Sequence, residues 1–286
     1  MRELELAEIH HQEGVSRGNA IDFLWDGGFI MAPSDQFDEA IEWYCTHMGW
    51  ICKANFENVG RMAFLKFPGK GQVVLKSYES QYPQFRYEEA QESRSRLCFS
   101  VENKDKAIAY FTTHGIKTSK FQVLPDGRET FEIHAFAGTI LTAVTTNTGK
   151  SKYPKSRIVG YSENVMQIKT KNLPEMIAFY ETVVGMKRLE YEGPEGYARL
   201  GAKDARSKLL DLVWLVPAET DNSTATNQST QPHFWIGPKK KDFYKAWQQL
   251  KAAGHTVSDL SGNPETWAAF YLLDPECNRI NVWNCK

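Results

Sequence analysis

The sequence predicts an α+β protein built from four copies of one small unit, in which a strand and a helix are followed by three strands. Segments that begin at Phe29 and Val165 share a short apolar strand, a turn and a helix pattern ending in glycine. A second pair of such segments begins at Leu97 and Phe234. Equivalent positions lie 137 residues apart at the first strand and 139 apart at the last. This near-constant offset indicates a tandem duplication, with two units in each half.

Each unit follows the same order along the chain. Its helix ends at a glycine, at Gly49, Gly115, Gly185 and Gly254, because glycine adopts the left-handed C-cap conformation without strain. Alternating apolar and polar residues after the helices predict half-buried strands. The organisation we predict is a polar extension at 1–20, a first domain at 21–146, a linker at 147–160 and a second domain at 161–286. The low-complexity segment 218–231 is either a lid over a site or a plain surface insertion.

Composition excludes several classes of function. The 286 residues are 42% hydrophobic and 24% charged, and 34 Lys and Arg oppose 35 Asp and Glu. A net charge of −1 offers no broad positive surface, so we expect no nucleic-acid or membrane partner. The five cysteines form no CxxC pair, so neither a disulfide framework nor a zinc knuckle is indicated. No signal peptide is evident at the N-terminus, and we expect a cytoplasmic protein.

Two segments resemble a known family. They are the strand and helix start at 165–181 and the closing Leu273-Asp-Pro-Glu-Cys-Asn-Arg-Ile-Asn-Val. Together they resemble the glyoxalase/bleomycin-resistance/extradiol-dioxygenase superfamily, also called vicinal oxygen chelate proteins, over about residues 25–285. The resemblance implies two tandem glyoxalase-like domains, with βαβββ units paired into cup-shaped mixed sheets. It also implies a divalent metal in the cup, held by His, Gln or Glu of first and fourth strands.

Strand alternation lets us predict which residues face the first cup. If Phe29 and Met31 pack under the helix, the cup positions of the first half are occupied by Gly28, Lys76, Arg96 and Thr142. None is a usual metal ligand, and the two cations would repel a dication. We expect this cup to be either purely structural or an anion-binding pocket that uses Lys76 and Arg96.

The second half offers Val165, Asp211, His233 and Asn281, with Gln167 on the same strand face. Because two ligands rarely retain a metal, we predict no cofactor; a divalent metal on atypical ligands is the alternative. We expect Asp211 to orient His233 as general base or acid, and Gln167 and Asn281 to donate hydrogen bonds to a substrate oxygen. A structural role for either member of this couple is the competing interpretation. Trp235 and Trp283 either line the cup or form an ordinary aromatic core.

These patterns favour a small-molecule enzyme of the lyase or isomerase type that acts by proton transfer without the usual metal. The predicted catalytic residues are His233 and Asp211, and the predicted substrate-binding residues are Gln167, Asn281, Trp235, Trp283, Arg96 and Lys76. One alternative is a binding protein that sequesters an antibiotic or similar aromatic ligand. Another is a metal-dependent lyase or dioxygenase with atypical ligands. We expect a monomer or a homodimer.

Overall fold

The structure is a computed structural model that describes residues 21, 23–58, 60–87, 94–146, 152–153, 156–204, 208–218, 229–236, 240–263, 265 and 267–284. The predicted extension at 1–20, part of the linker and most of the segment 218–231 lie outside these residues. Among the described residues, no helix is long and apolar enough to cross a membrane.

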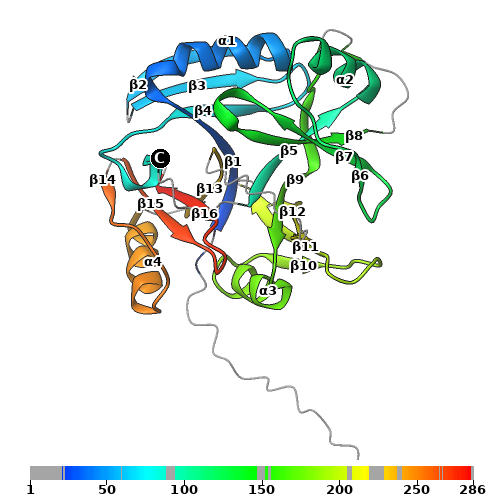
Figure 1. The fold of residues 1–286 in the computed structure, drawn as a ribbon. Helices are drawn as coiled ribbons and strands as arrows, with labels where there is room; N and C mark the ends of the chain where they lie inside the picture. The colour runs from blue at the N-terminus through cyan, green and yellow to red at the C-terminus, as the bar shows by residue number, and fades with distance from the viewer. Residues whose placement is uncertain are drawn as a thin grey trace, which may run out of the picture.

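Four βαβββ units follow one another, as predicted (Figure 1). The first contains β1 (Phe23–Ala32), α1 (Phe37–Met48), β2 (Ile51–Asn58), β3 (Gly60–Lys66) and β4 (Gln72–Ser77). The second contains β5 (Ser95–Val101), α2 (Lys104–Thr113), β6 (Gln122–Val123), β7 (Glu129–His134) and β8 (Ile140–Thr145). The third contains β9 (Gly160–Thr170), α3 (Leu173–Thr182), β10 (Lys187–Leu189), β11 (Ala198–Asp204) and β12 (Leu209–Pro217). The fourth contains β13 (Thr230–Ile236), α4 (Lys240–Ala252), β14 (Ser261–Asn263), β15 (Trp267–Leu273) and β16 (Arg279–Asn284). Short 3₁₀ turns are η1 (Ser34–Gln36), η2 (Pro83–Phe85) and η3 (Phe136–Gly138).

Local sequence explains the helix boundaries. Asn103 and Asn172 are the N-caps of α2 and α3, and their side chains accept hydrogen bonds from the amides of Lys106 and Glu175, which satisfies one of the free donors at each helix start. At the other end of α1, Gly49 has a φ of 77°, the left-handed C-cap that glycine favours.

The strand register shows which units share a cup. β1 pairs antiparallel with β13, and β5 pairs antiparallel with β9. Within the units, β4 lies parallel to β1 and β16 parallel to β13. The first unit therefore joins the fourth, and the second joins the third. We call the helix-free face of the first pair the outer-unit cup and that of the second pair the inner-unit cup. The grouping of cup residues by sequence halves was wrong.

The hydrophobic cores follow the halves of the chain, except that Phe23 and Trp25 at the start of β1 pack in the core of the second half. One core lies under α1 and α2 and includes Phe37, Tyr44 and Phe99, whereas the other lies under α3 and α4 and includes Tyr180 and Phe234. Each such fully buried large side chain contributes roughly 1.5–3 kcal/mol. Figure 1 shows the two helix pairs at opposite ends of the molecule, with the strands between them. The fold class is confirmed as two tandem glyoxalase-like domains; the boundaries 21–146 and 161–286 remain our proposal, which the two cores support.

Candidate functional site in the outer-unit cup

A bulge in β1 decides which residues enter the outer-unit cup. The pairing of β1 with β13 shifts register between Trp25 and Gly27, and an extra residue reverses the alternation of a strand. Phe29 and Met31 consequently face the cup, whereas Ile30 belongs to the core under the helices. The predicted orientation of this strand was therefore wrong, and Gly28 faces the core.

Gly28 shows this reversal directly. A Cβ built on Gly28 would lie 2.7 Å from Cδ2 of Leu97, and Leu97 packs in the core under α1 and α2. The glycine therefore lets the Leu97 side chain lie close to the backbone of β1 on the helix side of the sheet. It contributes no side chain to the cup.

His233 lies in the aromatic interior of this cup. Its ring stacks on Phe29 at a centroid distance of 4.8 Å and meets the edge of Trp283 at 5.2 Å. Its Nδ1 atom lies 3.3 Å from Oδ2 of Asp26, the residue at the bulge. Its Nε2 atom is buried and has no hydrogen-bond partner among the described residues. One ring nitrogen thus lies beside a carboxylate, and the other has no partner in this part of the chain.

The other predicted residues of the fourth unit surround this histidine. Asn281 is the strand neighbour of His233; its amide nitrogen donates to Oε1 of Gln231, and its buried Oδ1 has no partner. Trp283 is buried, with an indole N–H that is also unpartnered. Trp235 packs half-buried against the same aromatic cluster. The structure therefore brings His233, Asn281, Trp235 and Trp283 together.

Lys76 reaches the same cup from the first unit. It is completely buried, and its Nζ atom lies 4.2 Å from the ring centroid of Phe85 and 4.0 Å from the carboxylate of Glu79. Burial lowers the pKa of Lys76 to about 8, and the attraction of Glu79 opposes this effect only in part. The prediction that Lys76 and Arg96 share an anion-binding pocket is wrong, because the two residues belong to units that form different cups.

Residues 78–87, which we call the strap, cover the outer-unit cup. They leave the end of β4 and reach the fourth unit, where η2 packs against β15 (Figure 1). The Ser261 hydroxyl donates to the side chain of Gln84 at 2.9 Å, and the Arg279 guanidinium donates to the carbonyl of Arg86 at 3.1 Å. Phe85 is completely buried, with its ring 6.0 Å from Phe29 and 5.7 Å from Trp283. The strap thus fills the cup with its own aromatic side chain.

The inner-unit cup has a different chemistry. A row of neighbouring residues crosses its floor, in the order Arg96, Gln167, Trp214 and Arg199. Arg96 is buried and lies 3.9 Å from Glu132, which also contacts Lys169 at 3.1 Å. Thr142 stands beside Glu132 in the register. Ion pairs and polar side chains therefore occupy the space that aromatic rings occupy in the outer-unit cup.

Asp211 belongs to this inner-unit cup. Its Oδ2 atom accepts two hydrogen bonds from the Arg199 guanidinium, one of them at 2.9 Å from Nε. The expected Asp211–His233 couple is wrong, because the third and fourth units contribute to different cups. Sequence reasoning missed Asp26, the carboxylate that does lie beside His233. The pair Gly27-Gly28 after it was the available signal, since glycine often marks a bulge.

A pocket of about 310 Å³ opens in the third unit, over β10 and β11. Arg188, Tyr191, Tyr197 and Arg199 are among its lining residues, and the ring of Tyr191 lies 5.4 Å from that of Trp214. The charged lining side chains are Arg188, Glu190 and Arg199, and Arg199 is already paired with Asp211.

Neither cup fits the metal that the family implies. In the described part of the chain, no three His, Cys, Asp or Glu side chains are grouped to hold a metal ion. The positions that face the outer-unit cup from first and fourth strands hold Phe29, Lys76, His233 and Asn281. One imidazole and one amide next to a buried ammonium group form a poor donor set for a dication.

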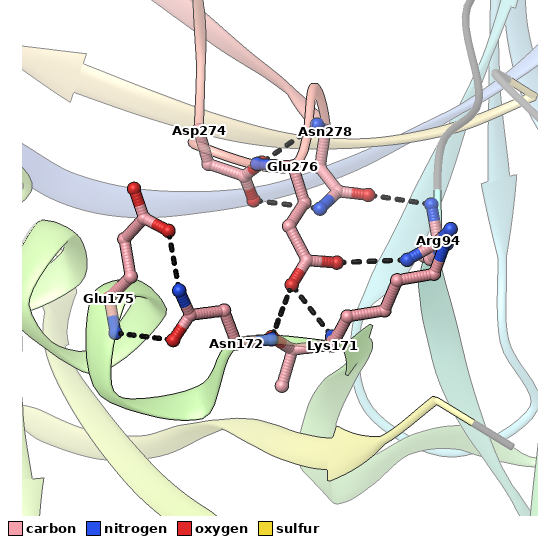
Figure 2. Close-up of polar contacts among 8 residues, drawn as sticks. Arg94, Lys171, Asn172, Glu175, Asp274, Glu276 and Asn278 are labelled. Carbon is pink, nitrogen blue, oxygen red and sulfur yellow. Dashed lines mark hydrogen bonds and ion pairs between the residues drawn. The ribbon is translucent and has the colours of Figure 1, made fainter. Parts of the chain in front are cut away.

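The turn between β15 and β16, which carried the family resemblance, is held by a network of hydrogen bonds (Figure 2). The Asp274 carboxylate accepts hydrogen bonds from the backbone amides of Glu276 and Asn278, the side chain of Asn278 and the Tyr180 hydroxyl. Burial raises the pKa of Asp274 to about 6, against the effect of these donors.

Glu276 and Asn278 connect this turn to other units (Figure 2). Glu276 accepts from the amides of Lys171 and Asn172 at the start of α3, and it pairs with Arg94 at 2.9 Å. Asn278 accepts from the Arg94 amide. Burial alone would raise the pKa of Glu276, but the hydrogen bonds from Thr170 and these amides, together with the charge of Arg94, outweigh this effect, so the pKa is lowered. The turn therefore holds the second, third and fourth units together.

The fold and the paired βαβββ units resemble those of glyoxalase-like proteins, and comparisons with known proteins agree with this. Residues 164–282 match the family described as Glyoxalase/Bleomycin resistance protein/Dioxygenase superfamily. Glyoxalase I from Zea mays has the same fold at a TM-score of 0.57, with 16% identity over 92% of each chain. A Bacillus subtilis protein named as a candidate dioxygenase gives a TM-score of 0.58, with 10% identity over 93% of this chain and 86% of its own. No curated protein sequence matches the chain. Residues 164–282 therefore match this superfamily by sequence, and the chain as a whole shares the fold of the two solved proteins.

Proposed function

We propose that this protein is a small-molecule enzyme of the lyase or isomerase type, in which His233 transfers a proton inside the outer-unit cup. The observation that carries the proposal is the state of the His233 ring. Asp26 lies 3.3 Å from Nδ1, and the buried Nε2 atom has no partner within the described ranges of the chain. A carboxylate at one nitrogen favours the tautomer whose other nitrogen can accept a proton.

The surroundings of His233 suit this role. Phe29 and Trp283 hold the ring from two sides, and an apolar wall strengthens electrostatic interactions inside the cup. The unpartnered N–H of Trp283 is a donor for negative charge that develops on a substrate oxygen. Gln167, which we expected in this role, lies in the inner-unit cup. The aromatic rings favour a planar, largely apolar ligand.

A binding protein without catalysis is the second candidate, and one observation favours it. Phe85 fills the cup in the closed state, so aromatic contacts alone could hold a ligand that displaces it. In that case Trp235 and Trp283 would contribute more to affinity than His233, and no product would form.

The test uses 5-nitrobenzisoxazole, a planar compound that any well-placed base converts to a coloured phenolate. The base removes the carbon-bound proton, the electron pair forms the nitrile and the N–O bond breaks. We expect the full chain to catalyse this reaction and His233→Gln to lose about a hundredfold in rate, the usual range for a general base. Asp26→Asn should also slow it. His134→Gln is the matched control, because His134 is exposed.

The same experiment separates the two candidates. Fluorescence of the cup tryptophans reports binding of the probe, and phenolate release reports catalysis. Binding without release in both the wild type and Phe85→Ala would favour the binding protein. An unchanged rate in a folded His233→Gln chain would refute the role of His233.

A further inference from the structure

The most unusual group in the outer-unit cup is the amine of Lys76. Lysine is almost never completely buried unless it is paired, and the ion pair of Lys76 with Glu79 is a long one, at 4.0 Å. The hydrogen bonds of Nζ go to the carbonyl and hydroxyl of Ser77, at 3.2 and 3.4 Å. The ring of Phe85 also lies against Nζ, and the strand neighbours of Lys76 in the register are two methionines, Met31 and Met62. This amine is desolvated, which is how proteins activate a lysine as a nucleophile.

Phe85 connects this amine to the site of His233. Its ring lies 4.2 Å from Nζ of Lys76 and 6.0 Å from the ring of Phe29, which stacks on His233. A ligand that takes the place of the Phe85 side chain would therefore meet Lys76 on one side. On the other side it would meet the wall that carries His233.

The proposed proton transfer also needs an electron sink. A proton on carbon becomes acidic enough only when the electrons left behind are stabilised, and the metal of the family would polarise a substrate oxygen for this purpose. The donor set of the outer-unit cup does not fit a metal, and a lysine occupies the fourth strand of the first unit. A primary amine performs the same task on a carbonyl compound by forming an imine.

We propose that Lys76 captures an aldehyde or ketone as an imine, so that the ligands of the outer-unit cup are planar carbonyl compounds. The amine nitrogen adds to the carbonyl carbon, and the adduct loses water to give a protonated imine. His233 then removes a proton from the neighbouring carbon, and the electron pair moves toward the imine nitrogen to form an enamine. Reprotonation and hydrolysis release the product and free amine. Only the proton-removal step rests on the proposed function of His233.

Two features of the structure support this chemistry. The lowered pKa of Lys76, about 8, gives a far larger share of neutral amine near pH 7.5 than an ordinary lysine with a pKa near 10.4 has. The aromatic wall of the cup also keeps bulk water away from the imine, which would otherwise hydrolyse before the proton moves.

The test is reductive trapping of the full chain with benzaldehyde and sodium cyanoborohydride at pH 7.5, followed by peptide mass spectrometry. We expect Lys76 to gain a benzyl group at least about tenfold faster than Lys66, an exposed lysine of the neighbouring strand β3, given the difference in neutral amine. Loosening the strap should increase the labelling further. Ser261→Ala removes only its hydrogen bond to Gln84 and provides a mild variant beside Phe85→Ala.

Equal or slower labelling of Lys76 than of Lys66, in the wild type and in Ser261→Ala, would overturn the proposal. Trapping requires no proton removal from carbon, and 5-nitrobenzisoxazole has no carbonyl group. A failure of the Lys76 proposal and a failure of the His233 proposal therefore give different results. Labelling of Lys76 in His233→Gln would show imine formation independent of the base.

Discussion

Replacing Asp274 with asparagine should change how the stability of this protein depends on pH. The Asp274 carboxyl is buried, and its pKa is raised from 3.8 to about 6 in the folded chain. Between these values the folded state binds a proton that the unfolded state has released, so stability falls as pH rises from about 4 to about 6. This shift in pKa corresponds to a loss of about 3 kcal/mol of stability, at about 1.4 kcal/mol for each tenfold change in proton affinity.

Asparagine keeps part of the turn while it removes the charge. Its oxygen can still accept from the amides of Glu276 and Asn278, which both bond to Oδ1 of Asp274. Its NH₂ group replaces Oδ2 and faces the Asn278 amide nitrogen and the Tyr180 hydroxyl. Loss of these two hydrogen bonds should cost about 1–3 kcal/mol. At pH 4 the variant should therefore be less stable than the wild type, and by pH 7 this difference should shrink or reverse.

The measurement is urea unfolding of both chains at pH 4 and pH 7. The quantity of interest is the difference in free energy of unfolding between the chains, because the other titrating groups then largely cancel. Asp259→Asn is the control, since the Asp259 side chain is 86% exposed. A difference that stays constant within about 0.5 kcal/mol between the two pH values would show that burial of the Asp274 charge carries no such cost.

Three further results should follow from the described contacts. Phe85→Ala should lower stability by about 3–5 kcal/mol, the usual cost of removing a buried phenylalanine, and it should speed the entry of 5-nitrobenzisoxazole. If urea unfolding shows unchanged stability, the strap does not pack into the cup in solution. Asp211→Asn should lower stability by about 1 kcal/mol, because it weakens the half-buried pair with Arg199. Its rate of phenolate release should stay within about twofold of the wild type, because His233 lies in the other cup. Equal losses of rate in Asp211→Asn and Asp26→Asn would contradict the separation of the cups. Metal analysis of the purified protein should find less than about 0.1 equivalent of Fe, Mn, Ni or Zn, since the cup donors suit none of them. A chelator should leave the rate of phenolate release unchanged. A full equivalent of any of these metals would refute this interpretation of the donor set.

The unit architecture could be predicted from sequence because it rests on local patterns. Helix-ending glycines, apolar first strands and a constant offset between halves specify four βαβββ units without any knowledge of contacts. The pairing of these units could not be predicted in the same way. Strand alternation shows which face of a strand is buried, but it does not show which edge the strand pairs with. The edges of β1 and β9 can meet either neighbour with the same face buried, so Lys76 and Arg96 were placed together in error.

The orientation of β1 is the second error. Residues 28–32 are buried on both faces of the strand, so alternation counted from Phe29 could not show which face lies under the helix. The bulge at Asp26 adds to this, because it places Phe23 and Trp25 on the core side but Phe29 and Met31 on the cup side. The predicted grouping of His233, Asn281, Trp235 and Trp283 on one sheet face agrees with the register, because β13 and β16 pair without a shift. Asp26 was missed because a single aspartate next to a tryptophan carries no periodic signal. Its role depends on a neighbour more than 200 positions away in sequence.

Sharing the cups between halves separates stability from chemistry in this chain. Each core lies mainly within one half, with Phe23 and Trp25 of β1 crossing into the core of the second half, so most of the packing that stabilises a half does not involve the residues that face a cup. Each cup takes one unit from each half, so a substitution in either half can alter a cup without disturbing the core beneath it. This arrangement lets the two cups diverge after duplication, one toward aromatic rings around His233 and Lys76 and the other toward paired ions around Arg96 and Arg199. It also means that the second half alone, although it carries the family match, lacks Asp26, Phe29 and Lys76. The proposed chemistry therefore requires both halves.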